Sequence, residues 1–313
     1  MKPLKPKRLQ HGDVIGICAP ASPPASESKL NKGIRYLEQL GYRVEIGKNV
    51  LKKKGYLAGT DKQRADDINT FFADHRIKAI FTVRGGYGSQ RILPLLNYNL
   101  IRWNPKILVG YSDITALHLA LLSQCGLVTF SGPMVAVEMS EGLSGNTEEQ
   151  FWSCLASTQP PDPFIGKPGI TSSIHRKAIS TGRLVGGNLS ILSSLVGSPN
   201  FPKQKKLALI IEEIDERPYR VDRMLQQLQS TGIFKNVTGL VLGDFSTCVH
   251  DKGKSSLSIQ EVFKSTFDGY NFPIVSNLCY GHMKNSRSFP IGVRVSIDGK
   301  KHRVIFLESG VTV

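Results

Sequence analysis

Residues 106–122 read KILVGYSDITALHLALL, an apolar strand that runs through a glycine and a serine directly into an apolar helix. The strand is predicted over residues 106–111, and the helix that follows contains Ile114, Leu117, Leu121 and Leu122. A strand followed at once by a helix is the repeating unit of a parallel sheet covered by helices. Ser112 is therefore expected where such a strand ends, at the carboxyl edge of the sheet.

The same alternation of strand and helix extends towards the N-terminus. Residues 13–19 (DVIGICA) predict the first strand, and Ser26 predicts the cap of a helix that Gly41 ends. The apolar face of that helix is formed by Leu30, Ile34, Leu37 and Leu40. The residues TDKQ have the spacing of a capping box, and the remaining strands of this half are predicted at 42–46 and 79–83.

The composition changes between residues 157 and 180, where STQPPDPFIGKPGITSSIHRKAIS is rich in Pro, Gly and Ser. Such composition is typical of a connection between domains. We therefore expect an N-terminal domain over 1–157, a linker over 158–182 and a C-terminal domain over 183–313. The strands predicted in the last of these lie at 184–187, 207–211, 239–242, 273–277 and, as a closing hairpin, 292–297 with 303–307.

The composition excludes several classes of protein. The 313 residues carry a formal charge of +15, but Lys and Arg are dispersed and no nucleic-acid reader motif accompanies them, so no nucleic-acid partner is expected. No apolar run approaches the roughly 20 residues of a membrane helix, and no export signal is visible. The cysteines and histidines lack metal-ligand spacing, so no metal is expected. No cofactor is expected either.

Ser112 is the first candidate for a catalytic residue. At a strand-to-helix junction its Oγ is exposed, and the N–H groups at the helix start can stabilise an oxyanion. The sequence Gly110-Tyr111-Ser112-Asp113-Ile114 resembles the nucleophile elbow G-x-S-x-G without its last glycine. By itself such a Ser-Asp pair is also consistent with a plain helix cap.

A glycine-rich loop, RGGYG at 84–88, follows another strand, where glycines let backbone N–H groups approach a ligand. Neither of the common phosphate-binding motifs is present. In the second half, Glu212 and Glu213 follow the apolar strand 207–211, and Glu212 continues it. His282 lies in a polar loop, and a histidine that titrates near neutrality suits a general base.

Taken together, six segments occur in the order typical of one peptidase family. They are GDVIGICAPAS at 12–22, VRGGYGSQRILPLL at 83–96, LVGYSDITAL at 108–117, GRLVGGNLSIL at 182–192, LIIEEIDERPYRVDRML at 209–225 and NLCYGHMKN at 277–285. They resemble successive blocks of the LD-carboxypeptidase family of serine peptidases, also called murein tetrapeptide carboxypeptidases, over nearly the whole chain.

The resemblance implies a Ser-Glu-His triad made of Ser112, Glu212 and His282. The family's usual Glu-Asp pair appears here as Glu212 and Glu213, so the choice between these neighbours stays open. The implied oxyanion hole consists of backbone N–H groups of Asp113 and of a glycine in the RGGYG block. The candidates for that glycine are Gly85 and Gly86.

Three further residues are candidates for binding substrate. Arg84 is a plausible partner for the free carboxylate that a carboxypeptidase must recognise, because a guanidinium binds a carboxylate through two parallel hydrogen bonds. Bracing of the loop is the alternative for Arg84. Asn188 and Tyr219 are expected to line the cleft between the two domains, where the active site is expected.

The resemblance also implies an α/β fold with an N-terminal parallel-sheet domain that carries the nucleophile. A C-terminal β-rich α/β domain would supply Glu and His, and the protein would form a homodimer. The implied activity is release of terminal D-alanine from murein tetrapeptide in the cytoplasm, during peptidoglycan recycling. A second branch of the family cleaves peptidyl or aminoacyl nucleotides and gives immunity to microcin C. An alternative of another class is a non-catalytic protein that binds a ligand or nucleic acid.

Overall fold

The computed structural model describes residues 3–167, 178–251, 253 and 255–313. These residues form two compact units. The first comprises Met1–Pro160, Arg287–Gly292 and Ser309–Val313, and the second comprises Pro161–Ser286 and Val293–Glu308. Residues 168–177, within the expected linker, lie outside the described residues.

The first unit contains a six-stranded sheet in the order β11-β5-β4-β3-β1-β2. Its strands are β1 (Val14–Cys18), β2 (Arg43–Ile46), β3 (Ile77–Thr82), β4 (Ile107–Gly110), β5 (Thr129–Ser131) and β11 (Phe289–Ile291). All neighbours pair in parallel except β11, which pairs antiparallel with β5. Every residue of β1 and β4 is buried, as expected for parallel strands covered on both faces.

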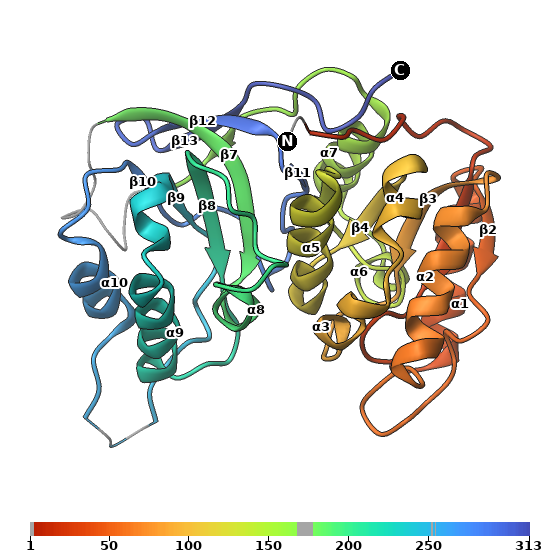
Figure 1. Cartoon of the computed structure of the whole chain (residues 1–313), viewed down its shortest axis with the longest axis horizontal. Helices are drawn as coiled ribbons and strands as arrows, with labels where there is room; N and C mark the ends of the chain where they lie inside the picture. Colours follow the sequence, from red (N-terminus) through yellow and green to blue (C-terminus); the bar gives the residue numbers. More distant parts are fainter. Residues whose placement is uncertain (1–2, 168–177, 252, 254) are drawn as a thin grey trace. The chain divides into compact units, whose positions relative to one another are not determined.

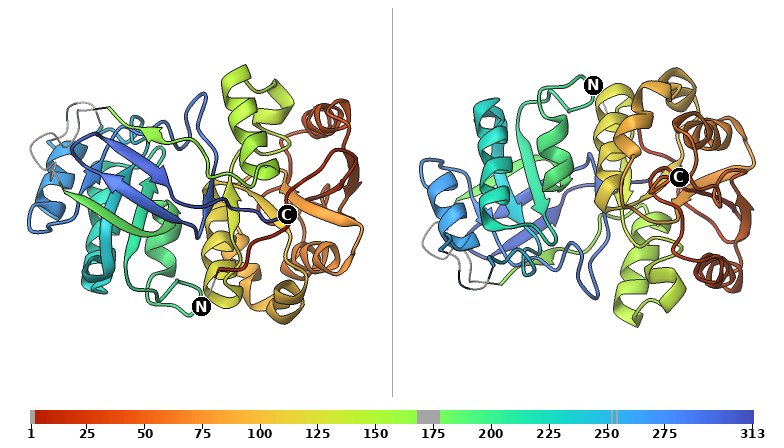
Figure 2. Two further views of the ribbon diagram at one scale, coloured as in Figure 1. Left: turned by 90° about the horizontal axis from the view of Figure 1, so that it is seen from above. Right: turned by 90° about the horizontal axis from the view of Figure 1, so that it is seen from below.

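Helices cover both faces of this sheet. They are α1 (Glu27–Gln39), α2 (Asp61–Ala73), α3 (Ser89–Ile92), α4 (Tyr98–Trp103), α5 (Thr115–Cys125), α6 (Glu138–Glu141) and α7 (Gly145–Ala156). Helices α1 and α7 lie on one face, and α2, α4 and α5 lie on the other (Figure 2). Helix α5 is buried on all sides over its first eight residues, so it is a fixed support for the turn that precedes it.

The local capping predictions for this unit are confirmed. The Ser26 side chain accepts a hydrogen bond from the Lys29 N–H, and Thr60 and Gln63 form a reciprocal capping box. Leu40 differs from the expectation, because α1 ends at Gln39. Leu40 occupies the C-cap and is exposed, because it lies beyond the last helical residue and so no longer shares the buried face of α1.

The second unit contains a seven-stranded sheet in the order β10-β9-β8-β7-β12-β13-β6. Its strands are β6 (Phe164–Ile165), β7 (Ile179–Asn188), β8 (Leu207–Glu212), β9 (Val237–Leu242), β10 (Ile274–Val275), β12 (Arg294–Asp298) and β13 (Arg303–Phe306). Strands β7 to β10 pair in parallel, whereas β12, β13 and β6 add an antiparallel part. Its helices are α8 (Leu189–Leu195), α9 (Pro218–Ser230) and α10 (Ile259–Phe267), labelled in Figure 1.

These two sheets confirm the predicted α/β class, with a parallel sheet in the N-terminal unit and a β-rich C-terminal unit. The division of the chain differs from the expected one near the C-terminus. Residues 287–292 belong to the first unit because Phe289–Ile291 pairs with Thr129–Ser131, and residues 309–313 return to the same unit. Among the residues described, no helix has both the length and the apolar character needed to cross a membrane.

Candidate active site

Ser112 follows β4 at the predicted strand-to-helix junction, separated from the strand by Tyr111, but the helix does not begin there. A 3₁₀ turn, Ser112–Ile114, comes first, and α5 begins at Thr115. The backbone φ of Ser112 is +63°, a left-handed conformation that costs a non-glycine residue about 1–2 kcal/mol. The turn is therefore sharp and strained at the serine, which is the backbone geometry of a nucleophile elbow.

The glycine-rich loop lies against this turn. A Cβ added to Gly85 would lie 2.8 Å from Ser112 Cβ, 3.0 Å from Ser112 Oγ and 3.3 Å from the Asp113 nitrogen. A glycine at position 85 thus lets the backbone approach the serine hydroxyl and the next peptide N–H. The three groups expected at an oxyanion site, namely the serine hydroxyl, the following N–H and a loop glycine, are neighbours within the first unit.

Gly86 has a different environment from Gly85. Its φ is +102°, and an added Cβ would lie 2.4 Å from Ser22 Oγ, so both the conformation and the space require glycine. The Ser22 N–H donates to the Gly85 carbonyl at 3.3 Å, and the Ser22 hydroxyl accepts from the Tyr87 N–H at 3.3 Å. Ser22, from the loop after β1, therefore fixes the backbone of the glycine-rich loop.

The side chain of Asp113 turns inward. Its Oδ2 accepts a hydrogen bond from the Ser89 N–H at 2.8 Å, and the residue is buried. Burial raises the pKa of the Asp113 carboxyl, while hydrogen bonds from Ser89 and Gly88 act in the opposite direction. The carboxylate thus ties the turn at Ser112 to the start of α3.

In the second unit, Glu212 and His282 form a hydrogen-bonded pair. Glu212 is the last residue of β8, its side chain has 0% exposure, and its Oε2 lies 2.8 Å from Nδ1 of His282. Gly281 has a φ of +124°, and a Cβ there would lie 2.8 Å from Glu212 Oε2. The glycine before the histidine therefore makes room for the carboxylate.

Glu213 makes different contacts from its neighbour. Its Oε1 accepts from Asn188 Nδ2 at 2.8 Å, and its Oε2 accepts from the Ser190 N–H at 2.8 Å and from the Ser190 hydroxyl at 2.5 Å. Asn188 also donates to Glu212 Oε1 at 3.3 Å and caps α8. Glu213 therefore anchors the start of α8, and the amide of Asn188 braces both carboxylates from a buried position.

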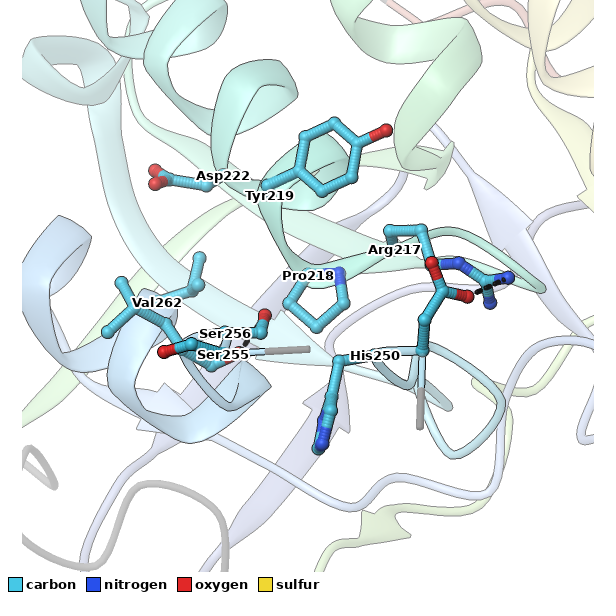
Figure 3. Close-up of a pocket in the computed structure, with 10 residues that line it drawn as sticks. Arg217, Pro218, Tyr219, Asp222, His250, Ser255, Ser256 and Val262 are labelled. Atoms are coloured by element: carbon cyan, nitrogen blue, oxygen red, sulfur yellow. Dashed lines mark hydrogen bonds and ion pairs between the residues drawn. The ribbon is translucent and has the colours of Figure 1, made fainter. Parts of the chain in front are cut away.

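Tyr219 stands on the first turn of α9 with 55% of its surface exposed. The Arg223 guanidinium lies 5.6 Å from the centre of its ring. Tyr219 contributes to a pocket of about 280 Å³ that Pro218 and His250 also line. In Figure 3, Pro218 lies between the Tyr219 ring and His250.

Arg84 follows β3 and is half-buried. Within the part of the chain that the structure describes, its guanidinium has no hydrogen-bond or ion-pair partner. The same part of the chain contains no cluster of three or more His, Cys, Asp or Glu side chains able to hold a metal ion.

Each unit thus assembles part of the predicted site. The first unit groups Ser112, Asp113, Gly85 and Gly86, and the second groups Glu212, His282 and Asn188.

Two residues that hydrogen-bond to the backbone near Ser112 were not predicted from the sequence. His118 Nε2 lies 2.8 Å from the carbonyl of Gly110, and Arg64 donates to the carbonyl of Gly88. A histidine inside an otherwise apolar helix was the available signal for the first of them. Arg64 carried no such signal, because an arginine in an amphipathic helix normally faces solvent.

The chain is similar to known proteins over most of its length. The sequence matches two domain models, described as the LD-carboxypeptidase N-terminal domain over residues 15–132 and the LD-carboxypeptidase C-terminal domain over residues 181–297. It is 37% identical over 309 residues to a "probable murein peptide carboxypeptidase" of Bacillus subtilis, a match that covers 98% of this chain and 95% of that protein.

Two solved structures extend the comparison. The muramoyltetrapeptide carboxypeptidase from Oxalobacter formigenes superposes with a TM-score of 0.82 at 30% identity, covering 94% of this chain and 97% of the other. The microcin C7 self-immunity protein MccF, known from Escherichia coli, superposes with a TM-score of 0.88 at 27% identity. That match covers 99% of this chain and 100% of MccF.

Proposed function

Because this chain belongs to the LD-carboxypeptidase family, we propose that it is a serine carboxypeptidase that releases terminal D-alanine from murein tetrapeptide. The bond cleaved joins the L centre of the third residue to the D-alanine. The observation that carries the proposal is the pair formed by the buried Glu212 carboxylate and His282 Nδ1 at 2.8 Å. Such a pair orients a histidine for base catalysis on a serine.

In this proposal His282 acts through Nε2. An ionised carboxylate only accepts hydrogen bonds, so Nδ1 donates to Glu212 and the lone pair of the neutral ring is on Nε2. Nε2 takes the proton of Ser112, Oγ attacks the scissile carbonyl, and the imidazolium returns the proton to the departing amine of D-alanine. Water activated by the same nitrogen then hydrolyses the acyl-enzyme.

Ser112 belongs to the first unit and the Glu212–His282 pair to the second, so the proposed triad takes its groups from both units. The tetrahedral oxyanion would be held by the Asp113 N–H and by an N–H of Gly85 or Gly86. The close approach of Gly85 to Ser112 Oγ supports this assignment.

Substrate recognition would involve Arg84 and Tyr219. Arg84 follows β3 at the start of the loop that packs on Ser112, and its guanidinium would bind the free carboxylate of D-alanine. Tyr219, half-exposed on α9, would contact the peptide. We assign Asn188 to bracing Glu212, since its amide already bonds both glutamates.

The setting we propose is the cytoplasm, where a homodimer of this chain would act on peptides recovered from peptidoglycan. The steps above need only water and the chain's own groups, with no cofactor and no nucleic-acid partner.

A second candidate, cleavage of aminoacyl nucleotides, is favoured by the similarity to MccF. Structures of MccF include complexes with aspartyl sulfamoyl adenosine and glutamyl sulfamoyl guanosine. If this chain shared that activity, the adenylate would be the leaving portion recognised beside the same serine.

The decisive assay incubates the purified chain with murein tetrapeptide, with its all-L diastereomer and with an aminoacyl nucleotide, and measures the released products. We expect D-alanine from the first substrate only, and a loss of about 10⁴-fold or more in turnover for Ser112→Ala. Cleavage of the nucleotide alone would favour the second candidate. Failure to cleave any of them, together with salt-sensitive oligonucleotide binding, would favour a non-catalytic binding protein.

A further inference from the structure

The peptide group that joins Gly88 to Ser89 is bonded on both sides by buried charged side chains. Its carbonyl oxygen accepts a hydrogen bond from Arg64 Nη1 at 2.8 Å. Its N–H, on Ser89, donates to Asp113 Oδ2 at 2.8 Å. Arg64 and Asp113 have only 1% and 3% exposure. Charge-assisted hydrogen bonds of this kind are stronger than those between neutral groups.

Arg64 has the contacts of a structural anchor. The same Nη1 also donates to the carbonyl of Pro20, and Nη2 pairs with Asp61 at the start of α2. Its Nε is buried without a hydrogen-bond partner among the described residues. Burying a guanidinium and leaving one of its N–H groups without a hydrogen bond is unfavourable. The hydrogen bonds from Nη1 and Nη2 therefore keep the Arg64 side chain buried.

The loop 85–88, which precedes this anchored peptide group, packs against Ser112. Gly85, at its start, lies where an added Cβ would be 3.0 Å from Ser112 Oγ. Gly88, at its end, has a φ of +123°, and a Cβ there would meet Arg64 Nη1 at 2.8 Å. Asp113, which holds the next residue, is covalently linked to Ser112. The loop and the nucleophile turn are therefore tied together through one peptide group.

We propose that Arg64 and the Asp113 carboxylate are positioning residues that clamp the Gly88–Ser89 peptide and so hold residues 85–88 against Ser112 before substrate binds. This inference rests on the proposed function only in assigning Ser112 as the nucleophile. Its consequence is a preformed oxyanion site, in which the loop N–H need not be reorganised during the reaction. The clamp acts on the rate of the chemical step rather than on substrate affinity.

The main test compares Asp113→Ala with Asp113→Asn. The alanine variant lacks the acceptor for the Ser89 N–H, whereas the asparagine variant retains an oxygen in the same place. We expect Asp113→Ala to lower kcat about 100-fold with KM within about threefold, and Asp113→Asn to recover at least about tenfold of that loss. Arg76→Met is the matched control, because it removes an exposed ion-paired arginine of the same unit.

Two readouts do not depend on the natural substrate. The rate at which a fluorophosphonate labels Ser112 should fall in parallel with kcat, because the phosphonyl oxygen occupies the oxyanion site. Hydrogen exchange at residues 85–89 should quicken in Asp113→Ala and in Arg64→Met, and stay unchanged in Arg76→Met. If Arg64→Met does not fold, the two Asp113 variants decide the question alone.

Labelling and exchange at wild-type levels in Asp113→Ala would overturn the clamp, as would an Asp113→Asn variant no faster than Asp113→Ala. If the wild-type chain fails to cleave murein tetrapeptide but shows the expected differences in labelling, the proposed substrate is wrong and the clamp stands. If the wild-type serine is not labelled at all, the assignment of Ser112 fails, and the clamp on a nucleophile fails with it.

Discussion

The carboxylate of Glu212 accepts a hydrogen bond from Nδ1 of His282 across 2.8 Å, from a site with no solvent exposure. Water therefore does not compete for this oxygen, and the second oxygen is braced by Asn188. The histidine ring is held in one orientation by a residue 70 positions away in the sequence. Glu213, one residue further on, faces Ser190 instead.

The two glutamates should respond differently to the same substitution. Glu212→Gln would present an amide to His282 and favour the wrong tautomer, so we expect kcat to fall by about 10³–10⁴-fold with little loss of stability. Glu213→Gln would place an NH₂ group among donors from Ser190 and Asn188. It should cost about 1–3 kcal/mol in the free energy of unfolding and change kcat less than tenfold. Steady-state kinetics and urea denaturation on both variants would show whether the roles are reversed.

Gly85→Ala should inactivate the protein without unfolding it. The added methyl would lie 2.8 Å from Ser112 Cβ, closer than real Cβ contacts, so the loop or the serine must shift. A displacement of even 1 Å at a reacting group costs on the order of 100-fold in rate. The control is Gly145→Ala, where an added Cβ meets nothing within 4 Å. Equal kcat values for the two variants would contradict the close approach of the loop.

The strain at Ser112 predicts a difference in stability between two inactive variants. Ser112→Ala retains a Cβ at a φ of +63°, whereas Ser112→Gly removes it. Glycine avoids the steric cost of the left-handed region, although it also increases the entropy of the unfolded chain. We expect Ser112→Gly to be about 1 kcal/mol more stable than Ser112→Ala by thermal or chemical denaturation. A less stable glycine variant would show that the turn is relaxed.

His118 should make stability depend on pH. Its Nδ1 lies 2.8 Å from Thr129 Oγ1 and its Nε2 lies 2.8 Å from the Gly110 carbonyl. Burial lowers the pKa of the His118 imidazole from 6.5 to about 4. Between these two values the unfolded chain binds a proton that the folded chain does not. The stabilising contribution is therefore complete above pH 6.5 and is lost as the pH falls towards 4.

The measurement compares the wild type with His118→Gln, whose amide can still donate to Gly110. Between pH 7 and pH 5 the wild type should lose about 2 kcal/mol more of its free energy of unfolding than the variant. His75→Gln, on an exposed histidine of the same unit, is the control and should follow the wild type. Parallel pH profiles for all three proteins would contradict the neutral, buried state of His118.

Local sequence patterns were enough to predict most elements and their ends. Ser26 and the TDKQ segment form the expected caps, because a cap depends only on residues three positions apart. Glu212 is the last residue of β8, and Ser112 follows the end of β4 after Tyr111, in both cases where an apolar run stops. The antiparallel addition of β11 to the first unit was not predicted, because a three-residue strand carries no mark of the partner it pairs with.

The sequence by itself determined the α/β class, the positions of most of the strands and the family to which the ordered blocks belong. Tertiary structure decided which of the adjacent carboxylates bonds His282, and that Arg64 and His118 point inward to hold the backbone around Ser112. The physical reason is range. Periodicity and capping act between residues a few positions apart, whereas these hydrogen bonds join groups whose proximity exists only after the sheets and helices have packed.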